Sequence, residues 1–338
     1  MIILNLTLKN KTVKTVVWAC KGVLLLIAHD IEIIKDNKKY KVSNNTFTGS
    51  VLEVVSYDVK GSGYDREYST VNGAQGRFFN SVYEEKKTVS LRLRYQVDKM
   101  AQVTHLKSNL QALLRGHYYL RELSTPDTSI KYEDIFNTKP QEFELDYVDG
   151  RQIFVGLVNA ISIDTTQTSG EFELEFETIE LPYFESIAYS TDLESESRSV
   201  EKWAVSDSLP FNVNDNKRKY TFHDTKICNV YYAGTVEINQ INQDSTVEVT
   251  LAENVSKNDK NGTTFYMVES GDVINIKGLE LKAGDTIKFD GIHTFRNGLN
   301  IDAYNVSRRN PTLIPGWNTF RSTKLMQKVV FKHKEYYM

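Results

Sequence analysis

Cysteine and proline are scarce in this chain of 338 residues, which contains two cysteines and six prolines. Cys20 and Cys228 lie far apart and form no CxxC pair, so the sequence encodes neither a disulfide framework nor a zinc knuckle. We expect both to be buried free thiols. The six histidines never fall at HxxxH spacing. The sequence therefore predicts no metal site and no cofactor.

Sequence motifs of common enzyme classes are also missing. The chain has no GxSxG elbow, no glycine-rich phosphate loop and no GxGxxG that opens a helix. A glycosidase needs only two carboxylates about 5–10 Å apart, and sequence alone does not exclude such a pair among 44 acidic residues. The acids mostly alternate along predicted strand faces, where solvation is the usual explanation. We predict that the protein is not an enzyme and has no catalytic residues.

An excess of positive charge is missing as well. The 41 Lys and Arg residues against 44 Asp and Glu give a net charge of −3, which argues against sequence-specific nucleic-acid binding. The apolar run over 16–28 is broken by Lys21 and is shorter than the roughly 20 residues that span a bilayer, so we expect no membrane insertion. A lipoprotein cleavage box is disfavoured by the bulk of Trp18. Residues 1–27 are interpreted as a leader of uncertain structure, either an extra strand or a flexible segment.

The residues that are abundant favour strands, since the chain contains 19 tyrosines and 16 phenylalanines. Residues 88–97 (TVSLRLRYQV) and 171–177 (EFELEFE) alternate apolar and polar side chains with the period of two that is typical of half-buried strands. Residues 98–115 instead repeat apolar side chains every three or four positions, which predicts one amphipathic helix with Asp98 as N-cap and Gly116 as its stop. The predicted hairpin turns are Asn72-Gly73, Asp149-Gly150 (the clearest), Asn261-Gly262, Asp290-Gly291 and Asn297-Gly298.

These patterns predict a mainly β protein with two domains. The first domain covers 28–189 and contains the helix. Residues 190–209 are rich in Ser and Glu, which is typical of a linker. The short strand-like runs of 210–338 favour a C-terminal β-sandwich or jelly roll.

Charge on two predicted strands suggests an interface. Arg92 and Arg94 lie on the wet face of one strand, and four glutamates lie on the wet face of another. Like charges on one strand repel unless opposite charges answer them, so the two sets should pair either within one sheet or across a subunit boundary. We therefore hypothesise that part of this surface is an interface. The candidate interface residues are Arg92, Arg94, Glu171, Glu173, Glu175 and Glu177.

The order of several motifs resembles the distal tail proteins (Dit family) of siphophages that infect Gram-positive bacteria. A Gly-Arg element precedes a long strand, a Leu-rich helix ending in Gly follows, and a GEFELEFE strand is followed by Pro-Tyr. The corresponding residues are Gly73, Gly76, Arg77, Leu110, Leu113, Leu114, Gly116, 170–176 and Pro182-Tyr183. The stretches LKAGDTIKFDG and LIPGWNTF are similar to the second domain of that family.

The resemblance implies a structural virion protein at the tail tip or baseplate. It implies that the first domain is a belt that forms a hexameric ring, and that the second is a galectin-like or jelly-roll β-sandwich. The implied partners are the tail tube protein, the tail-associated protein and receptor-binding or fibre proteins, with a surface glycan as a further partner of the C-terminal domain. Assembly would take place in the host cytoplasm.

Two alternatives stay open. One is a cell-surface β-sandwich that binds or cleaves carbohydrate, although the leader is no clean export signal. The other is a tail tube protein, which would polymerise into long tubes, whereas a distal ring should stop at one layer or a face-to-face pair.

Overall fold

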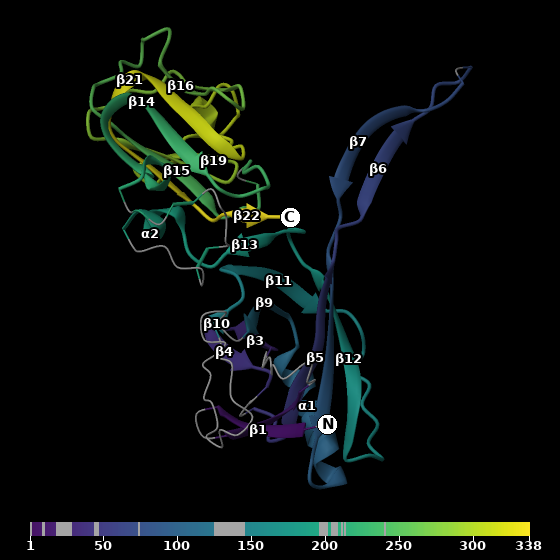
Figure 1. Ribbon diagram of the computed structural model, residues 1–338. Coiled ribbons are helices and arrows are strands. Elements are labelled where there is room, and N and C mark those ends of the chain that lie inside the picture. The colour runs from purple at the N-terminus through teal and green to yellow at the C-terminus, as the bar shows by residue number, and fades with distance from the viewer. Residues whose placement is uncertain are drawn as a thin grey trace, which may run out of the picture. The chain divides into compact units, whose positions relative to one another are not determined.

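The computed structural model describes residues 2–8, 11–17, 29–43, 47–73, 75–124, 146–195, 202–203, 209–210, 212, 214–239 and 241–338. The chain is mainly β, as predicted, and divides into two compact units. The first comprises 1–148 and 152–182, and the second comprises 149–151 and 183–338. Each unit is described separately below (Figure 1).

The first unit contains twelve strands and one helix in its described residues. Their bounds are β1 (Ile2–Leu8), β2 (Lys11–Val17), β3 (His29–Lys35), β4 (Lys38–Lys41), β5 (Val51–Lys60), β6 (Tyr64–Ser69), β7 (Phe78–Glu84), β8 (Thr88–Gln96), α1 (Met100–Leu113), β9 (His117–Ser124), β10 (Asp146–Tyr147), β11 (Arg151–Leu157) and β12 (Ser169–Thr178). The main sheet has the order β4-β3-β9-β11-β12-β8-β5. Two hairpins, β1–β2 and β6–β7, form sheets of their own, so backbone of the predicted leader is in strands.

Helix α1 forms where the apolar spacing predicts it, and it buries Val103, Leu106, Leu110 and Leu113. Its N-cap is Lys99 rather than Asp98, so that detail of the prediction was wrong. The Gln102 side chain instead accepts hydrogen bonds from the backbone N–H groups of residues 98 and 99, at 2.9 and 3.1 Å. This is the reach-back half of a capping box, which needs no side-chain acceptor at residue 98.

The hairpin predicted at Asp149-Gly150 is wrong. Strand β10 pairs with β9 through Asp146↔Ser124, and the described residues show no pairing of β10 with β11. Gly150 instead lies against the backbone of Trp203, and a Cβ atom at 150 would overlap the Trp203 backbone nitrogen. The glycine is needed for a close backbone approach and not for a hairpin turn.

Of the other four predicted hairpin turns, three are present and one is not. Asn72-Gly73, Asp290-Gly291 and Asn297-Gly298 each connect two strands that pair with each other, as predicted. Asn261-Gly262 lies between β15 and β16, and each of these strands pairs with β21, so the hairpin predicted there is wrong.

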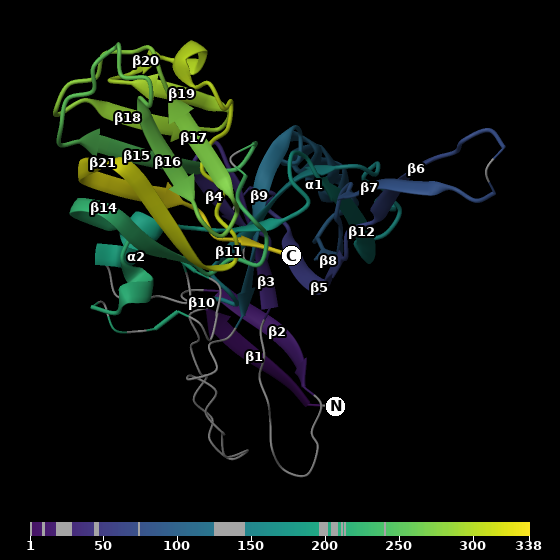
Figure 2. The same ribbon diagram turned by 90° about the horizontal axis from the view of Figure 1, so that it is seen from above.

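The second unit contains ten strands, β13 to β22, in its described residues. Its elements are β13 (Phe184–Ser186), α2 (Ser190–Ser195), η2 (Asn216–Arg218), β14 (Thr221–Tyr232), β15 (Ser245–Leu251), β16 (Thr263–Met267), β17 (Asp272–Ile276), β18 (Thr286–Asp290), β19 (His293–Arg296), β20 (Leu299–Asn300), η3 (Asp302–Tyr304), β21 (Gly316–His333) and β22 (Tyr336–Tyr337). The sheet order is β17-β16-β21-β15-β18-β19-β20, with β14 also on β21. Figure 2 shows β18, β15, β21 and β14 side by side in this unit.

Strand β21 organises the second core, because its 18 residues pair with β14, β15 and β16. Phe320 and Phe331 of this strand pack edge to face at 5.5 Å, and Phe320 stacks on Phe265 at 5.7 Å between ring centroids. All three rings are fully buried. Each such side chain contributes about 1.5–3 kcal/mol by leaving water.

The predicted linker over 190–209 is packed into the second unit in its described residues. Its first six residues form α2, and Ser190 donates a hydrogen bond of 2.9 Å to the Phe331 carbonyl oxygen. Trp203 is 0% exposed. One large apolar side chain is enough to anchor a polar segment when a pocket receives it, which composition alone does not reveal.

Candidate interaction surface of the first unit

Strands β8 and β12 place the predicted charged residues on one face of the main sheet. Along β8, the apolar residues Val89, Leu91, Leu93 and Tyr95 are at most 1% exposed. Their neighbours alternate to the other face because successive side chains of a strand point to opposite sides. On β12, Glu171, Glu173 and Glu175 are exposed in the same way. The surface formed by the six candidate residues and Glu53 is called the charged face below.

The antiparallel register brings opposite charges together within the chain. Glu171 lies directly opposite Arg94, and Glu173 lies opposite Arg92. The Arg94 Nη2 atom is 2.8 Å from Glu171 Oε1, and Arg94 Nη1 is 3.8 Å from Glu53 Oε2 on β5. Arg92 Nε is 3.7 Å from Glu171 Oε2. Of the two arrangements left open by the sequence, pairing across neighbouring strands is therefore present.

The remaining glutamates have different environments. Ser90 Oγ donates a hydrogen bond to Glu173 Oε1. Glu177 Oε2 lies 2.5 Å from Lys86 Nζ, and this hydrogen bond raises the pKa of Lys86. For the Glu175 carboxylate, the described residues supply no side-chain partner. These groups are solvated, so their ion pairs add little to the stability of the fold.

A second feature of this unit was missed by the sequence reasoning. Hairpin β6–β7, called the arm below, projects beyond the ends of β5 and β8 (Figure 1), and a backbone hydrogen bond from Glu85 N–H to the Gly63 carbonyl joins its base. Every residue of β6 is exposed. Phe78 and Phe79 are 56% and 58% exposed. The other large apolar side chains exposed on the arm are Tyr64, Tyr68, Val71, Val82 and Tyr83.

The two faces of the arm differ in chemistry. On one face, Tyr68 packs against Phe79 at 6.0 Å, and the guanidinium of Arg77 lies 3.8 Å from the Tyr68 ring centroid. On the other face, Tyr83 donates a 3.0 Å hydrogen bond to Asp65, which raises the pKa of Tyr83. The sequence signal was the run FFNSVY, which places apolar side chains on both faces of one strand. Apolar groups on both faces of an isolated hairpin are typical of a segment that is covered by a partner.

Across the described ranges, no group of three or more His, Cys, Asp or Glu side chains is arranged to hold a metal ion. Of the helices in those ranges, none has both the length and the hydropathy needed to cross a bilayer. Cys228 is a buried free thiol as predicted, and Cys20 lies outside the described residues.

Comparison with solved structures relates both units to a phage protein. The chain superposes on the crystal structure of Dit from phage SPP1 over 90% of its own length and 98% of that protein, with a TM-score of 0.51 and 10% sequence identity. This chain has the Dit fold. The resemblance to distal tail proteins that the motifs predicted is thus confirmed at the level of the fold.

Weaker likenesses exist to the phage P2 baseplate in its activated conformation. The structures with calcium and with strontium have TM-scores of 0.36 and 0.33, at 9% and 10% identity, over 91% of this chain and 98% of the matched chains. TM-scores this low do not establish a shared fold. No protein-family model and no curated protein sequence matches the chain.

Proposed function

We propose that this chain is a structural component of a phage tail tip that forms the hub between the tail tube and the adsorption proteins. One observation carries the proposal, namely that the Dit fold extends over both units and over 98% of SPP1 Dit. That protein is described as a paradigm of the hub adsorption apparatus in phages that infect Gram-positive bacteria. A likeness confined to one unit would support only a shared domain.

The proposed assembly is a closed hexameric ring built from the first unit. The arm exposes more apolar surface than one copy can cover, which favours contact with another subunit. The charged face carries both signs of charge, which rejects misaligned neighbours more than it strengthens binding. A closed ring satisfies such heterologous contacts without producing open-ended fibres.

In this proposal the protein has no turnover and needs no cofactor. The second unit would anchor receptor-binding or fibre proteins, and the ring would contact the tail tube protein and the tail-associated protein within the virion, after assembly in the host cytoplasm. The net charge of −3 suits a ring through which DNA passes, because a cationic lining would bind phosphates.

Electron microscopy and light scattering of the purified chain test the ring. We expect six-fold rings in one layer or in a face-to-face pair, with the mass of six or twelve copies. Long tubes would identify a tail tube protein instead. A monodisperse monomer at high concentration would refute the hub.

Carbohydrate binding is the second candidate function. A specific observation favours it, because a hollow in the second unit combines an exposed indole with unpaired carboxamides.

A further inference from the structure

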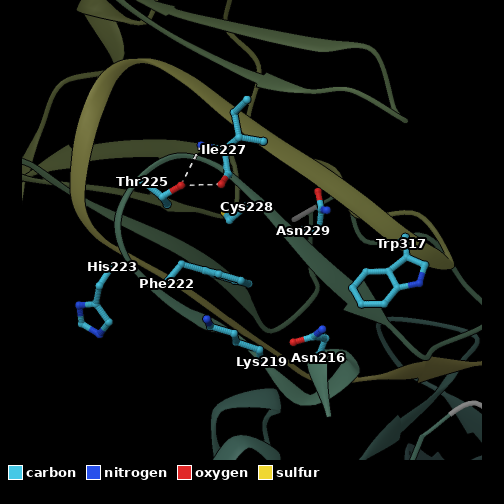
Figure 3. A pocket seen from close by; sticks show the side chains of 9 residues that line it. All are labelled: Asn216, Lys219, Phe222, His223, Thr225, Ile227, Cys228, Asn229 and Trp317. Atoms are coloured by element: carbon cyan, nitrogen blue, oxygen red, sulfur yellow. Dashed lines mark hydrogen bonds between the residues drawn. The ribbon is translucent and has the colours of Figure 1, made fainter. Parts of the chain in front are cut away.

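The second unit has a hollow of about 680 Å³ beside β14 and the start of β21 (Figure 3). This volume lies within the roughly 300–1,000 Å³ of small-molecule sites. In Figure 3, His223 lies at one end and Trp317 at the other, with Phe222 and Lys219 between them. The hollow is lined by Asn216, Lys219, Phe222, His223, Thr225, Ile227, Cys228, Asn229 and Trp317.

Two buried side chains give the hollow an apolar lining. Phe222 and Cys228 are 8% and 6% exposed. Burial raises the pKa of the Cys228 thiol to about 12, so this group is neutral and behaves as a small apolar side chain. The Cys228 thiol therefore offers no thiolate nucleophile, and it serves the hollow as an apolar surface.

An indole is held at the rim. Trp317 is 43% exposed and packs edge to face against Tyr231, at 5.2 Å between ring centroids. Lys217 Nζ lies 4.6 Å from the Tyr231 ring centroid, so the supporting ring is itself held by a cation–π contact. An aromatic ring that is packed on one side and open on the other is ready to stack with a ligand at little cost in conformational entropy.

Three polar side chains of the lining form no hydrogen bond within the described part of the protein. Within the described residues, the side chains of Asn216, His223 and Asn229 have no hydrogen-bond partner, and all three are exposed. Two carboxamides supply both donors and acceptors, which is the pattern that hydroxyl groups match. The sequence placed none of these residues in a site, because they are spread over η2 and β14.

The charge of the lining is positive. Lys219 contributes an ammonium group, 5.3 Å from the Phe222 ring centroid, and the lining contains no Asp or Glu. Nearby acids lie outside it: Asp215 accepts a 2.9 Å hydrogen bond from the Lys217 N–H, and Asp224 is an exposed neighbour on β14. A ligand with negative charge is favoured over a cation.

We propose that this hollow binds an acidic oligosaccharide. A sugar ring offers a flat C–H face to Trp317, hydroxyl groups to Asn216 and Asn229, and a carboxylate or phosphate to Lys219. This assignment deepens the proposed function and rests on it only for its setting, the adsorption apparatus.

An added peptide strand fits the site less well. Thr225 Oγ1 donates a 2.6 Å hydrogen bond to the Ile227 carbonyl and accepts one of 3.1 Å from the Ile227 N–H. The register of β14 against β21 shifts at this point. A strand that pairs along β14 needs an unbroken row of free backbone groups, and this bulge interrupts the row.

An array of neutral and acidic oligosaccharides, probed with the full chain, tests the proposal. It is followed by calorimetry with hyaluronan hexasaccharide, cellohexaose and hexaglutamate. We expect acidic saccharides to bind at least tenfold more tightly than neutral ones, and hexaglutamate not to bind. If no acidic saccharide on the array binds, or if hexaglutamate binds as tightly as the best saccharide, the proposal is overturned.

Two variants locate the binding. Trp317→Ala should weaken the best saccharide at least tenfold, whereas the matched control Tyr304→Ala, which removes another exposed aromatic ring of the same unit, should leave it unchanged. Lys219→Ala should remove the preference for acidic over neutral saccharides. Equal losses in the Trp317 and Tyr304 variants would overturn the assignment.

Electron microscopy of the same preparation separates this proposal from the hub. Rings that bind no saccharide overturn the saccharide site alone. Saccharide binding by a chain that remains monomeric supports the site and overturns the hub.

Discussion

The fully buried carboxyl group of Glu335 gives the second unit a specific pH dependence. Burial raises the pKa of Glu335 to about 8, and its Oε2 atom accepts hydrogen bonds of 3.0 and 2.8 Å from the backbone N–H groups of Ala233 and Gly234. His333 Nδ1 lies 3.7 Å from Glu335 Oε1, and burial lowers the pKa of His333 to about 4. The pair is therefore neutral in the folded protein near pH 6.

The sign of the effect follows from counting protons. Between pH 6.5 and 8 the folded protein holds a proton on Glu335, while the unfolded chain, with a carboxyl pKa near 4.5, does not. The free energy of unfolding should fall by about 1.4 kcal/mol per pH unit, or about 2 kcal/mol over this window. Between pH 4.5 and 6.5 the unfolded chain holds its proton on His333 instead, so the two proton counts match and stability should be flat. Below pH 4.5 the unfolded chain also protonates the Glu335 carboxyl and holds two protons against one in the folded protein. Stability should therefore fall until the folded His333 is itself protonated near pH 4.

Glu335→Gln isolates this effect, because glutamine keeps the acceptor for the two backbone N–H groups and removes the acid. Urea unfolding of the full chain, followed by tryptophan fluorescence at pH 6.5, 7.25 and 8, measures the slope through the buried Trp203. We expect the variant to be flat over this window, so that it gains about 2 kcal/mol relative to the unmodified chain between pH 6.5 and 8.

The matched control is Glu280→Gln, which neutralises an exposed carboxylate of the same unit and should keep the original slope. A flat profile in the unmodified chain would refute the reasoning. Retention of the full slope by Glu335→Gln would refute it as well, because the slope would then come from another group.

Three further predictions concern assembly and packing. Arg94→Glu places three carboxylates together and should dissociate the ring at low salt, as measured by light scattering. The double variant Arg94→Glu/Glu171→Arg restores the ion pair within the chain but should lose the ring as well. Intact rings in both variants would contradict an interface at the charged face. Replacing residues 64–84 with a short Gly-Ser turn should abolish the rings. The melting temperature of the monomer should change little, because the arm buries almost nothing. Rings that survive the replacement would exclude the arm from assembly. Phe320→Ala should destabilise the second unit by about 3–5 kcal/mol in urea unfolding, whereas Phe79→Ala on the arm should cost almost nothing.

Local periodicity predicted the elements well. The alternation over 88–97 and 171–177 placed each side chain on its correct face, and the apolar spacing over 98–115 located α1. These patterns are reliable because the side-chain period of a strand or helix is fixed by the backbone of that segment. For the candidate charged residues, the sequence left open whether they pair within one sheet or between subunits. The structure shows that β8 and β12 are direct neighbours, so the charges meet within the chain.

Which strands pair with each other was less predictable from the sequence. The dipeptide Asp149-Gly150 has the chemistry of a hairpin turn, yet β10 pairs with β9, and the glycine serves an approach to Trp203. The segment around Trp203 has the composition of a linker but contains a fully buried anchor. A turn signal states which backbone angles are accessible and does not state which strand will be the neighbour.

The sequence by itself determined the mainly β character, helix α1 and the solvated faces of β8 and β12, because each depends on side chains a few residues apart. Only the tertiary structure decided the neutral Glu335–His333 pair and the hollow between His223 and Trp317. Both depend on segments that are distant in sequence. In the first case these segments bury a carboxyl group, and in the second they leave polar side chains without hydrogen-bond partners. Desolvation and the arrangement of a binding site are properties of the packed chain, and no local pattern encodes them.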